Sequence, residues 1–282
     1  MGDRFRLACI QVNAGNEIGS NVATALKLIE RAAADGADFI SLPECVALLE
    51  PDRAALRGKC LLEGDHPALA AFQHVAVERS IWLHVGSLAV LTPKADIANR
   101  TFLIDPAGVI VARYDKIHMF DVDLADGESY RESDTYRPGT AAAVADLPWG
   151  SLGLTICYDI RFPGLYRDLA KAGADFIGVP SAFTRTTGQA HWHVLLRARA
   201  IETGCWVFAA AQCADHGAGR QTYGHSLIVN PWGEIVAEAG EEPGVIVADI
   251  DRGQVTEARR MLPVLSNARP YRPATATGRA AE

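Results

Sequence analysis

Residues 36–43 read GADFISLP, and residues 173–180 read GADFIGVP, at an offset of 137 residues. Each segment opens on a glycine that can end a helix. It continues as a short apolar run, which predicts a buried strand. Unrelated α/β units can converge on such similar sequences. The order of the elements around the two segments nevertheless favours an internal repeat.

The predicted elements follow the same order in both halves of the chain. The first half predicts strands over residues 5–13, 37–43 and 81–90, a helix from a cap at Asn21 to Gly36, a helix over 66–79, and a hairpin over 102–114. The second half predicts strands over 151–158, 174–180 and 206–212, helices over 163–173 and 189–203, and a hairpin that turns at 230–233. We therefore predict an α/β fold, a four-layer α-β-β-α sandwich with an internal pseudo-twofold repeat.

The chain is predicted to form one domain over residues 1–262, because no linker rich in Gly, Ser or Pro separates the halves. Residues 263–282 hold Pro263, Pro270 and Pro273 followed by small residues, which predicts an extended C-terminal tail. The alternative is that this tail crosses onto a partner subunit.

The composition is that of a globular protein, with 49% hydrophobic and 22% charged residues among 282. The formal net charge of −7 argues against a nucleic-acid partner, which would require a basic surface. The six cysteines form no Cys-x-x-Cys pair, the N-terminal residues do not resemble a signal peptide, and no apolar run reaches the ~20 residues that span a membrane. We expect a cytoplasmic protein with free thiols and no membrane partner.

Three chemically complementary residues stand at the carboxyl ends of predicted strands, where α/β folds place their ligands. They are Glu44, Lys116 and Cys157. Taken singly, each has an ordinary interpretation: a solvated loop glutamate, a surface lysine and a small core residue. Together they supply a base, a cation and a thiol, which acyl transfer through a thioester requires. The backbone N–H of Tyr158 is a further candidate donor to the oxyanion.

Three short segments resemble the signatures of the nitrilase superfamily of carbon–nitrogen hydrolases. They read LPE at 42–44, YDKIH at 114–118 and CYDIRFP at 157–163, and the resemblance covers roughly residues 5–272. It implies a triad in which Glu44 is the base, Lys116 the oxyanion donor and Cys157 the nucleophile. It also implies that Glu132 holds Lys116 and helps to orient the amide, although a salt bridge of Glu132 with Arg131 or Arg137 is the alternative. At least a homodimer is implied, with no metal or organic cofactor.

The residues after the nucleophile favour one branch of this superfamily. Tyr158 and Asp159 stand where true nitrilases tend to have Trp-Glu, and residues 116–123, 157–163 and 196–203 resemble the Nit branch. That branch includes deaminated glutathione amidases and ω-amidases, whose substrates carry an amide and a distant carboxylate. We expect an amidase for such a small molecule. The alternatives are an N-carbamoyl or other aliphatic amide on the same triad, or a non-enzymatic binding scaffold.

A carboxylate-bearing substrate requires cationic or hydroxyl partners, and four residues are candidates for substrate binding: Tyr158, Arg161, Ser181 and Thr184, with Arg185 a further possibility. Arg161 has alternatives, since it could pair with Asp159 or lie at a subunit interface. The pair His191 and His193 does not predict a metal site, because side chains two residues apart on a helix diverge.

Overall fold

Two mixed β-sheets form the centre of the computed structural model, which describes residues 2–124, 127, 129–217 and 219–272 of the chain. The first sheet has the order β17 (Gly244–Asp251), β1 (Arg4–Gln11), β2 (Phe39–Ser41), β4 (Trp82–Leu91), β5 (Ile97–Ile104), β6 (Ile110–Asp115), and β3 (Leu61–Leu62) pairs with β4. The second has the order β16 (Ile235–Glu238), β15 (Leu227–Val229), β12 (Trp206–Ala209), β11 (Phe176–Gly178), β10 (Gly150–Leu154), β9 (Ala143–Leu147).

The two sheets repeat one pattern. Strands β1, β2 and β4 are parallel neighbours, and β5 and β6 continue the sheet antiparallel. In the second sheet β10, β11 and β12 are parallel, and β15 and β16 continue antiparallel. Strands β17 and β9 add antiparallel strands at corresponding positions beside β1 and β10. The predicted pseudo-twofold repeat is confirmed.

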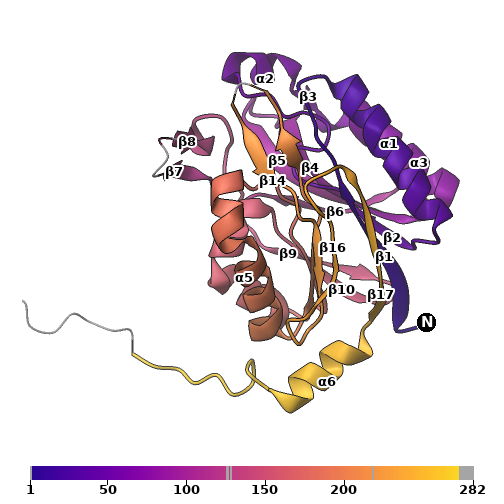
Figure 1. The fold of residues 1–282 in the computed structure, drawn as a ribbon, viewed down its shortest axis with the longest axis vertical. Coiled ribbons are helices and arrows are strands. Elements are labelled where there is room, and N and C mark those ends of the chain that lie inside the picture. The colour runs from indigo at the N-terminus through magenta and orange to yellow at the C-terminus, as the bar shows by residue number, and fades with distance from the viewer. Residues whose placement is uncertain (1, 125–126, 128, 218, 273–282) are drawn as a thin grey trace, which may run out of the picture.

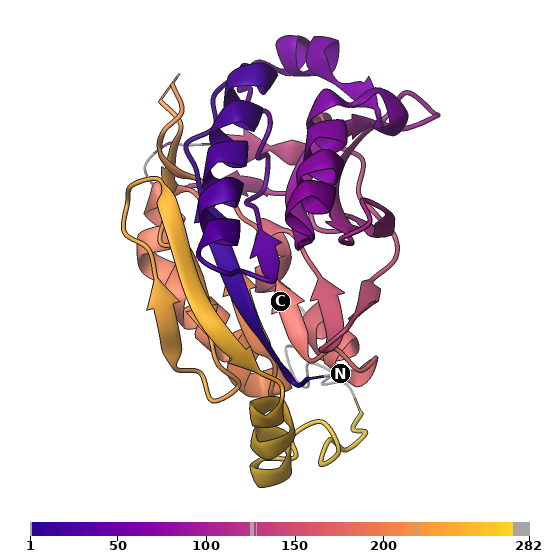
Figure 2. The same ribbon diagram turned by 90° about the vertical axis from the view of Figure 1, so that its right-hand side faces the viewer.

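Helices cover the outer faces of both sheets (Figures 1 and 2). Helices α1 (Ile18–Ala34) and α3 (Pro67–Arg79) pack together on the first sheet, and α4 (Pro163–Lys171) and α5 (Arg185–Thr203) pack on the second. The predicted α-β-β-α sandwich is therefore confirmed. The remaining elements are α2 (Arg53–Lys59), α6 (Gly253–Met261), the 3₁₀ turns η1 (Glu63–Asp65), η2 (Glu132–Asp134) and η3 (Cys157–Arg161), and the hairpins β7 (Asp121–Asp123) with β8 (Ser129–Arg131) and β13 (Cys213–Asp215) with β14 (Gln221–Tyr223).

Strand β1 shows how the sequence builds this layering. Its alternate residues Phe5, Leu7 and Cys9 belong to the core between the sheets, whereas Ala8 and Ile10 belong to the core under α1 and α3. Successive side chains of a strand point to opposite faces, so a strand buried on both sides reads as a continuous apolar run. The Phe5 ring lies edge-on to the Phe176 ring of the second sheet, 5.2 Å between centroids, and so joins the inner faces.

Several boundaries differ from the sequence prediction. Helix α1 begins at Ile18, so Asn21 lies inside the helix and is not its cap. The Asn21 side chain instead forms hydrogen bonds with the backbone of Gly15 and with the Ala47 carbonyl, both of which lie outside the helix. Helix α5 begins at Arg185, four residues earlier than predicted, because Thr184 caps it. Strand β10 ends at Leu154, before the predicted boundary.

The C-terminal region was predicted only in part. Strand β17 and helix α6 follow the second hairpin and were not predicted. Residues 263–272 form a turn and irregular chain, and the rest of the predicted tail, 273–282, lies outside the described residues. None of the helices in the described ranges has the length and apolarity needed to cross a bilayer.

Candidate active site

Glu44 follows β2, and the close approach of β4 fixes its position. A Cβ atom on Gly86 would lie 2.0 Å from the Leu42 carbonyl oxygen, so only glycine lets β4 pass this close to the chain before Glu44. The Leu42 N–H also donates to the His84 carbonyl at 2.9 Å. Glu44 itself is 4% exposed, and its Oε2 accepts a hydrogen bond from the Ala182 N–H of the second half at 2.8 Å. The carboxylate therefore joins the two halves.

Lys116 follows β6 and is buried between two carboxylates. Its Nζ lies 2.8 Å from Glu44 Oε1 and 2.9 Å from Glu132 Oε1. Glu132 lies in η2, and its Oε2 accepts a bond from the Phe120 N–H at 2.7 Å. The two arginines considered as alternative partners of Glu132 pair with other carboxylates, Arg131 with Asp123 and Arg137 with Asp96.

Asn99, on β5, completes this cluster and was not among the predicted site residues. Its Nδ2 donates to Glu44 Oε1 at 2.9 Å and to Glu132 Oε1 at 3.2 Å. The amide thereby lies between two carboxylates that also share the Lys116 ammonium. Asn99 Oδ1 is buried and has no hydrogen-bond partner among the described residues. A buried oxygen in that state is available to a donor from a ligand.

Cys157 begins the turn η3, three residues beyond the end of β10, and its backbone has the left-handed φ of 48°. Residues other than glycine rarely adopt this conformation, and such residues concentrate at functional sites. The Cys157 N–H donates to the Pro180 carbonyl at 2.9 Å, which ties the turn to the segment after β11. The thiol lies beside Glu44, the same carboxylate that contacts Lys116.

The buried Asp159 connects the turn of Cys157 to the loop that follows Lys116. Its Oδ2 accepts from the Ile156 N–H at 2.9 Å and the Tyr114 hydroxyl at 2.7 Å, and its Oδ1 lies 2.6 Å from His118 Nδ1. The His118 ring also stacks on Phe162. One carboxylate thus links two segments that are distant in the sequence.

Electrostatics set the charge states of Glu44, Lys116 and Cys157. Burial raises the pKa of Glu44, but the charge and hydrogen bond of Lys116 outweigh burial and bring that pKa below its ordinary value. Burial lowers the pKa of Lys116, and the charges of Glu132 and Glu44 reverse this and hold it well above the ordinary value. Burial, followed by the charge of Glu44, raises the pKa of the Cys157 thiol well above its ordinary value. The resting site is therefore a carboxylate, an ammonium and a neutral thiol.

A cavity of about 390 Å³ opens onto these groups and is lined by Glu44, Asn99, Lys116, Glu132 and Cys157, among others. Its size is in the range of small-molecule sites. Its wall also contains Arg220, whose Nε is buried and lacks a hydrogen-bond partner within the described part of the chain. By contrast, the cavity residue Arg53 pairs with Asp134 at 2.6 Å.

The residues predicted to bind substrate are distributed unequally. Tyr158 and Thr184 line the cavity, although the Thr184 hydroxyl already caps α5 and contacts the Thr187 hydroxyl at 2.8 Å. Ser181 is not among the described lining residues, because it is fully buried and its hydroxyl donates to the Val179 carbonyl. Arg161 also lies outside that lining. Its guanidinium is placed over the Phe183 ring and beside His191, not beside Asp159.

Arg185 lies on the exposed start of α5 and contacts Glu241, at 3.4 Å.

The residues predicted for the site did not include Asn99 and Arg220, which line the cavity. Asn99 follows no motif and lies inside a strand. Arg220 lies beyond the second sheet's strand β12, in the connection between β13 and β14, where the sequence gives no sign of which way its side chain points.

A family model described as carbon–nitrogen hydrolase matches residues 6–260. A deaminated glutathione amidase from Yersinia enterocolitica is 40% identical over 266 residues, which cover 93% of this chain and 92% of that protein. An omega-amidase from Homo sapiens is 37% identical over 268 residues, covering 94% and 95%. The crystal structure of the C. elegans NitFhit protein has a TM-score of 0.90 at 38% identity and covers 95% of this chain and 66% of that one.

Proposed function

This chain belongs to the carbon–nitrogen hydrolase family, and from that premise we propose that it cleaves a small carboxylate-bearing amide through a thioester on Cys157. One observation carries the proposal: the Cys157 thiol lies beside the Glu44 carboxylate, which in turn lies 2.8 Å from the Lys116 ammonium, at the wall of one cavity. Nucleophile, base and cation are then together where an amide can enter.

The chemistry follows from the charge states of these groups. Because the resting thiol is neutral, it must lose its proton as it attacks, and Glu44 accepts that proton while the S–C bond forms. Lys116 stabilises the negative charge that develops on the carbonyl oxygen. Collapse of the tetrahedral intermediate breaks the C–N bond, and Glu44 returns the proton to the departing ammonia or amine. Water, deprotonated by Glu44, then cleaves the thioester, which yields the carboxylic acid and the free thiol.

Glu132 and Asn99 act as positioning residues in this scheme. Glu132 accepts a hydrogen bond from Lys116, as Glu44 does, and the Asn99 amide donates to both carboxylates. With two carboxylates beside it, Lys116 stays protonated in the free enzyme, as its raised pKa requires. Its positive charge is therefore present before substrate binds, which is what makes an oxyanion site effective.

The substrate class rests on Arg220. The Arg220 Nε is buried without a hydrogen-bond partner among the described residues, which is unfavourable, and a carboxylate can satisfy it with a charge-assisted hydrogen bond. The relatives named deaminated glutathione amidase and omega-amidase are consistent with a substrate that has an acid at one end and an amide at the other. We therefore place the substrate with its amide at Cys157 and its carboxylate at Arg220.

Ammonia or amine release from deaminated glutathione, 2-oxoglutaramate and an N-carbamoyl amino acid tests the reaction, with intact-mass detection of an acyl adduct. Cys157→Ala should abolish turnover and adduct, and Cys60→Ala, which removes a buried thiol that is not among the described lining residues, should retain both. Full turnover by Cys157→Ala would contradict the covalent route. Preference for the carbamoyl compound would favour the alternative substrate, and no turnover with any amide would favour a binding scaffold.

Arg220→Gln separates substrate recognition from chemistry. Loss of a charge-assisted pair should raise KM roughly tenfold or more for the two carboxylate-bearing amides. Turnover of a short neutral amide such as butyramide should change little, because it has no carboxylate for Arg220 to bind. An equal loss with both kinds of amide would show that Arg220 supports the fold instead.

The assembly state is a separate proposal. The family resemblance implies a homodimer or a larger homo-oligomer, and multi-angle light scattering of the purified chain measures it directly. A monomer at all accessible concentrations would contradict this proposal without affecting the catalytic one.

A further inference from the structure

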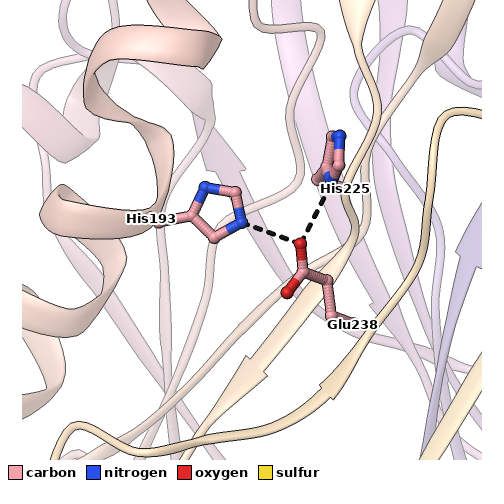
Figure 3. Close-up of side chains that lie close together, drawn as sticks. All are labelled: His193, His225 and Glu238. Atoms are coloured by element: carbon pink, nitrogen blue, oxygen red, sulfur yellow. Dashed lines mark hydrogen bonds and ion pairs between the residues drawn. The ribbon is translucent and has the colours of Figure 1, made fainter.

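A second cluster of chemically capable side chains lies on the second half of the molecule and has no role in the reaction above. It consists of His193 on α5, His225 just before β15, and Glu238 at the end of β16 (Figure 3). Glu238 Oε1 lies 2.8 Å from His193 Nε2 and 2.9 Å from His225 Nδ1. All three potential ligand atoms lie within 4.8 Å of one another.

The backbone holds these side chains in place. The His225 carbonyl accepts a bond from the Trp192 indole at 2.8 Å, and Trp192 is the neighbour of His193 on α5. The His225 N–H donates to the Gly240 carbonyl at 3.0 Å, and His225 has the uncommon left-handed φ of 53°. Glu238 pairs with Leu227 across the β15–β16 ladder. Three rigid elements therefore present the three groups to one point.

The cluster is open to solvent and separate from the cavity. The side chains of His193, His225 and Glu238 are 32%, 21% and 36% exposed. None of them is among the described residues that line the cavity. A group bound here can keep a coordination position for water, and it would not touch a substrate at Cys157.

We propose that His193, His225 and Glu238 bind one divalent transition-metal ion of the Zn²⁺ class, at a site that joins α5 to β16. Two imidazole nitrogens and one carboxylate oxygen are a preferred donor set for Zn²⁺, with water as the fourth ligand. Donor atoms bound to one tetrahedral zinc are about 3.4 Å apart, since each bond is about 2.0–2.1 Å long. The imidazole–carboxylate contacts therefore open by roughly half an ångström when the ion enters.

Partial exposure makes this adjustment available, because the cluster is not packed on every side. Each imidazole turns a lone pair to the ion by shifting its proton to the other ring nitrogen. The sequence gives no sign of this site. His191 and His193 do diverge, as predicted, and His191 contacts Arg161 instead. The second and third ligands come from segments more than 30 residues away in the chain.

Titration of the tag-free, chelator-treated full chain with Zn²⁺ alone at pH 7.5 tests the proposal by calorimetry and thermal melting. We expect saturable binding of one ion per chain and a higher Tm with zinc. His225→Ala and Glu238→Gln should each weaken binding roughly tenfold or more. The control His74→Ala removes an exposed histidine that also pairs with a glutamate, His74 with Glu78, and should bind zinc unchanged.

Zinc can also bind thiols, so Co²⁺ provides a second readout. The proposed nitrogen and oxygen ligands give only weak visible bands, whereas a cysteine ligand adds an intense near-ultraviolet charge-transfer band. Absence of saturable zinc binding, or binding that survives both ligand variants, would overturn the proposal. If His225→Ala does not fold, Glu238→Gln decides alone, because it keeps the size of the side chain.

Discussion

Asp159 offers a quantitative test of how the site is built. Replacement by alanine removes the acceptor of two buried donors, the Ile156 N–H and the Tyr114 hydroxyl, and the partner of His118. Each buried donor left unsatisfied costs about 1–3 kcal/mol, so the two together predict a loss of about 4 kcal/mol in the free energy of unfolding. Asp159→Asn keeps one acceptor oxygen and should lose less.

Urea unfolding followed by circular dichroism at one fixed protein concentration measures this loss, because concentration affects oligomer stability. Amidase assays of the same variants separate the two effects. At temperatures where Asp159→Asn stays folded, kcat should fall while KM changes little, because the turn of Cys157 and the loop after Lys116 lose their common anchor. A loss below about 1 kcal/mol for Asp159→Ala, with unchanged kcat, would refute this reasoning.

Three further variants test the site. In Glu44→Gln the pKa of the Cys157 thiol should fall, because the charge of Glu44 helps to raise it. Alkylation of Cys157 by iodoacetamide, followed by mass spectrometry, should then reach its plateau at lower pH than in wild type. An unchanged pH profile would contradict the assigned contact between Glu44 and Cys157. Asn99→Leu removes the two hydrogen bonds that the Asn99 amide donates to Glu44 and Glu132, and should lower kcat roughly tenfold. Rates at saturating substrate measure this effect, and a wild-type kcat would refute it. Gly86→Ala should lower both Tm and activity, because the added Cβ has no space. The control Gly58→Ala lies inside a helix, where an added Cβ meets no atom within 4 Å, and should lower neither. Equal melting curves for the two variants would disprove the packing argument.

The layers, and the positions of Glu44, Lys116 and Cys157 at the ends of strands, were predictable because both depend on local patterns. Apolar runs after helix-ending glycines locate the central strands, and Glu44, Lys116 and Cys157 each follow a strand or hairpin in a short motif. The structure brings these three groups to one cavity. Two sheets, each with parallel strands at its centre, pack face to face and bring these residues together. That topology follows from the repeated order of the elements along the chain.

Features that depend on long-range contacts were not predictable. Asn21 looks like a cap by residue type, but tertiary bonds to a neighbouring loop use its amide within α1. Asn99 and Arg220 join the site from a strand interior and a connection, where no local pattern distinguishes them. Ser181 follows a strand, as a ligand-binding residue would, yet its hydroxyl faces the backbone of Val179. Side-chain direction was the missing information in each case.

The order in which the strands of the first sheet are made has a consequence for biosynthesis. Strand β17 is the last strand of the chain and pairs through all eight of its residues with β1, the first strand. While the ribosome is still making the second half, β1 has an unpaired edge, and nascent chains with open edges are prone to association. We expect the newly made polypeptide to need protection by chaperones until translation is almost complete, and enzyme truncated before residue 244 to accumulate as aggregate.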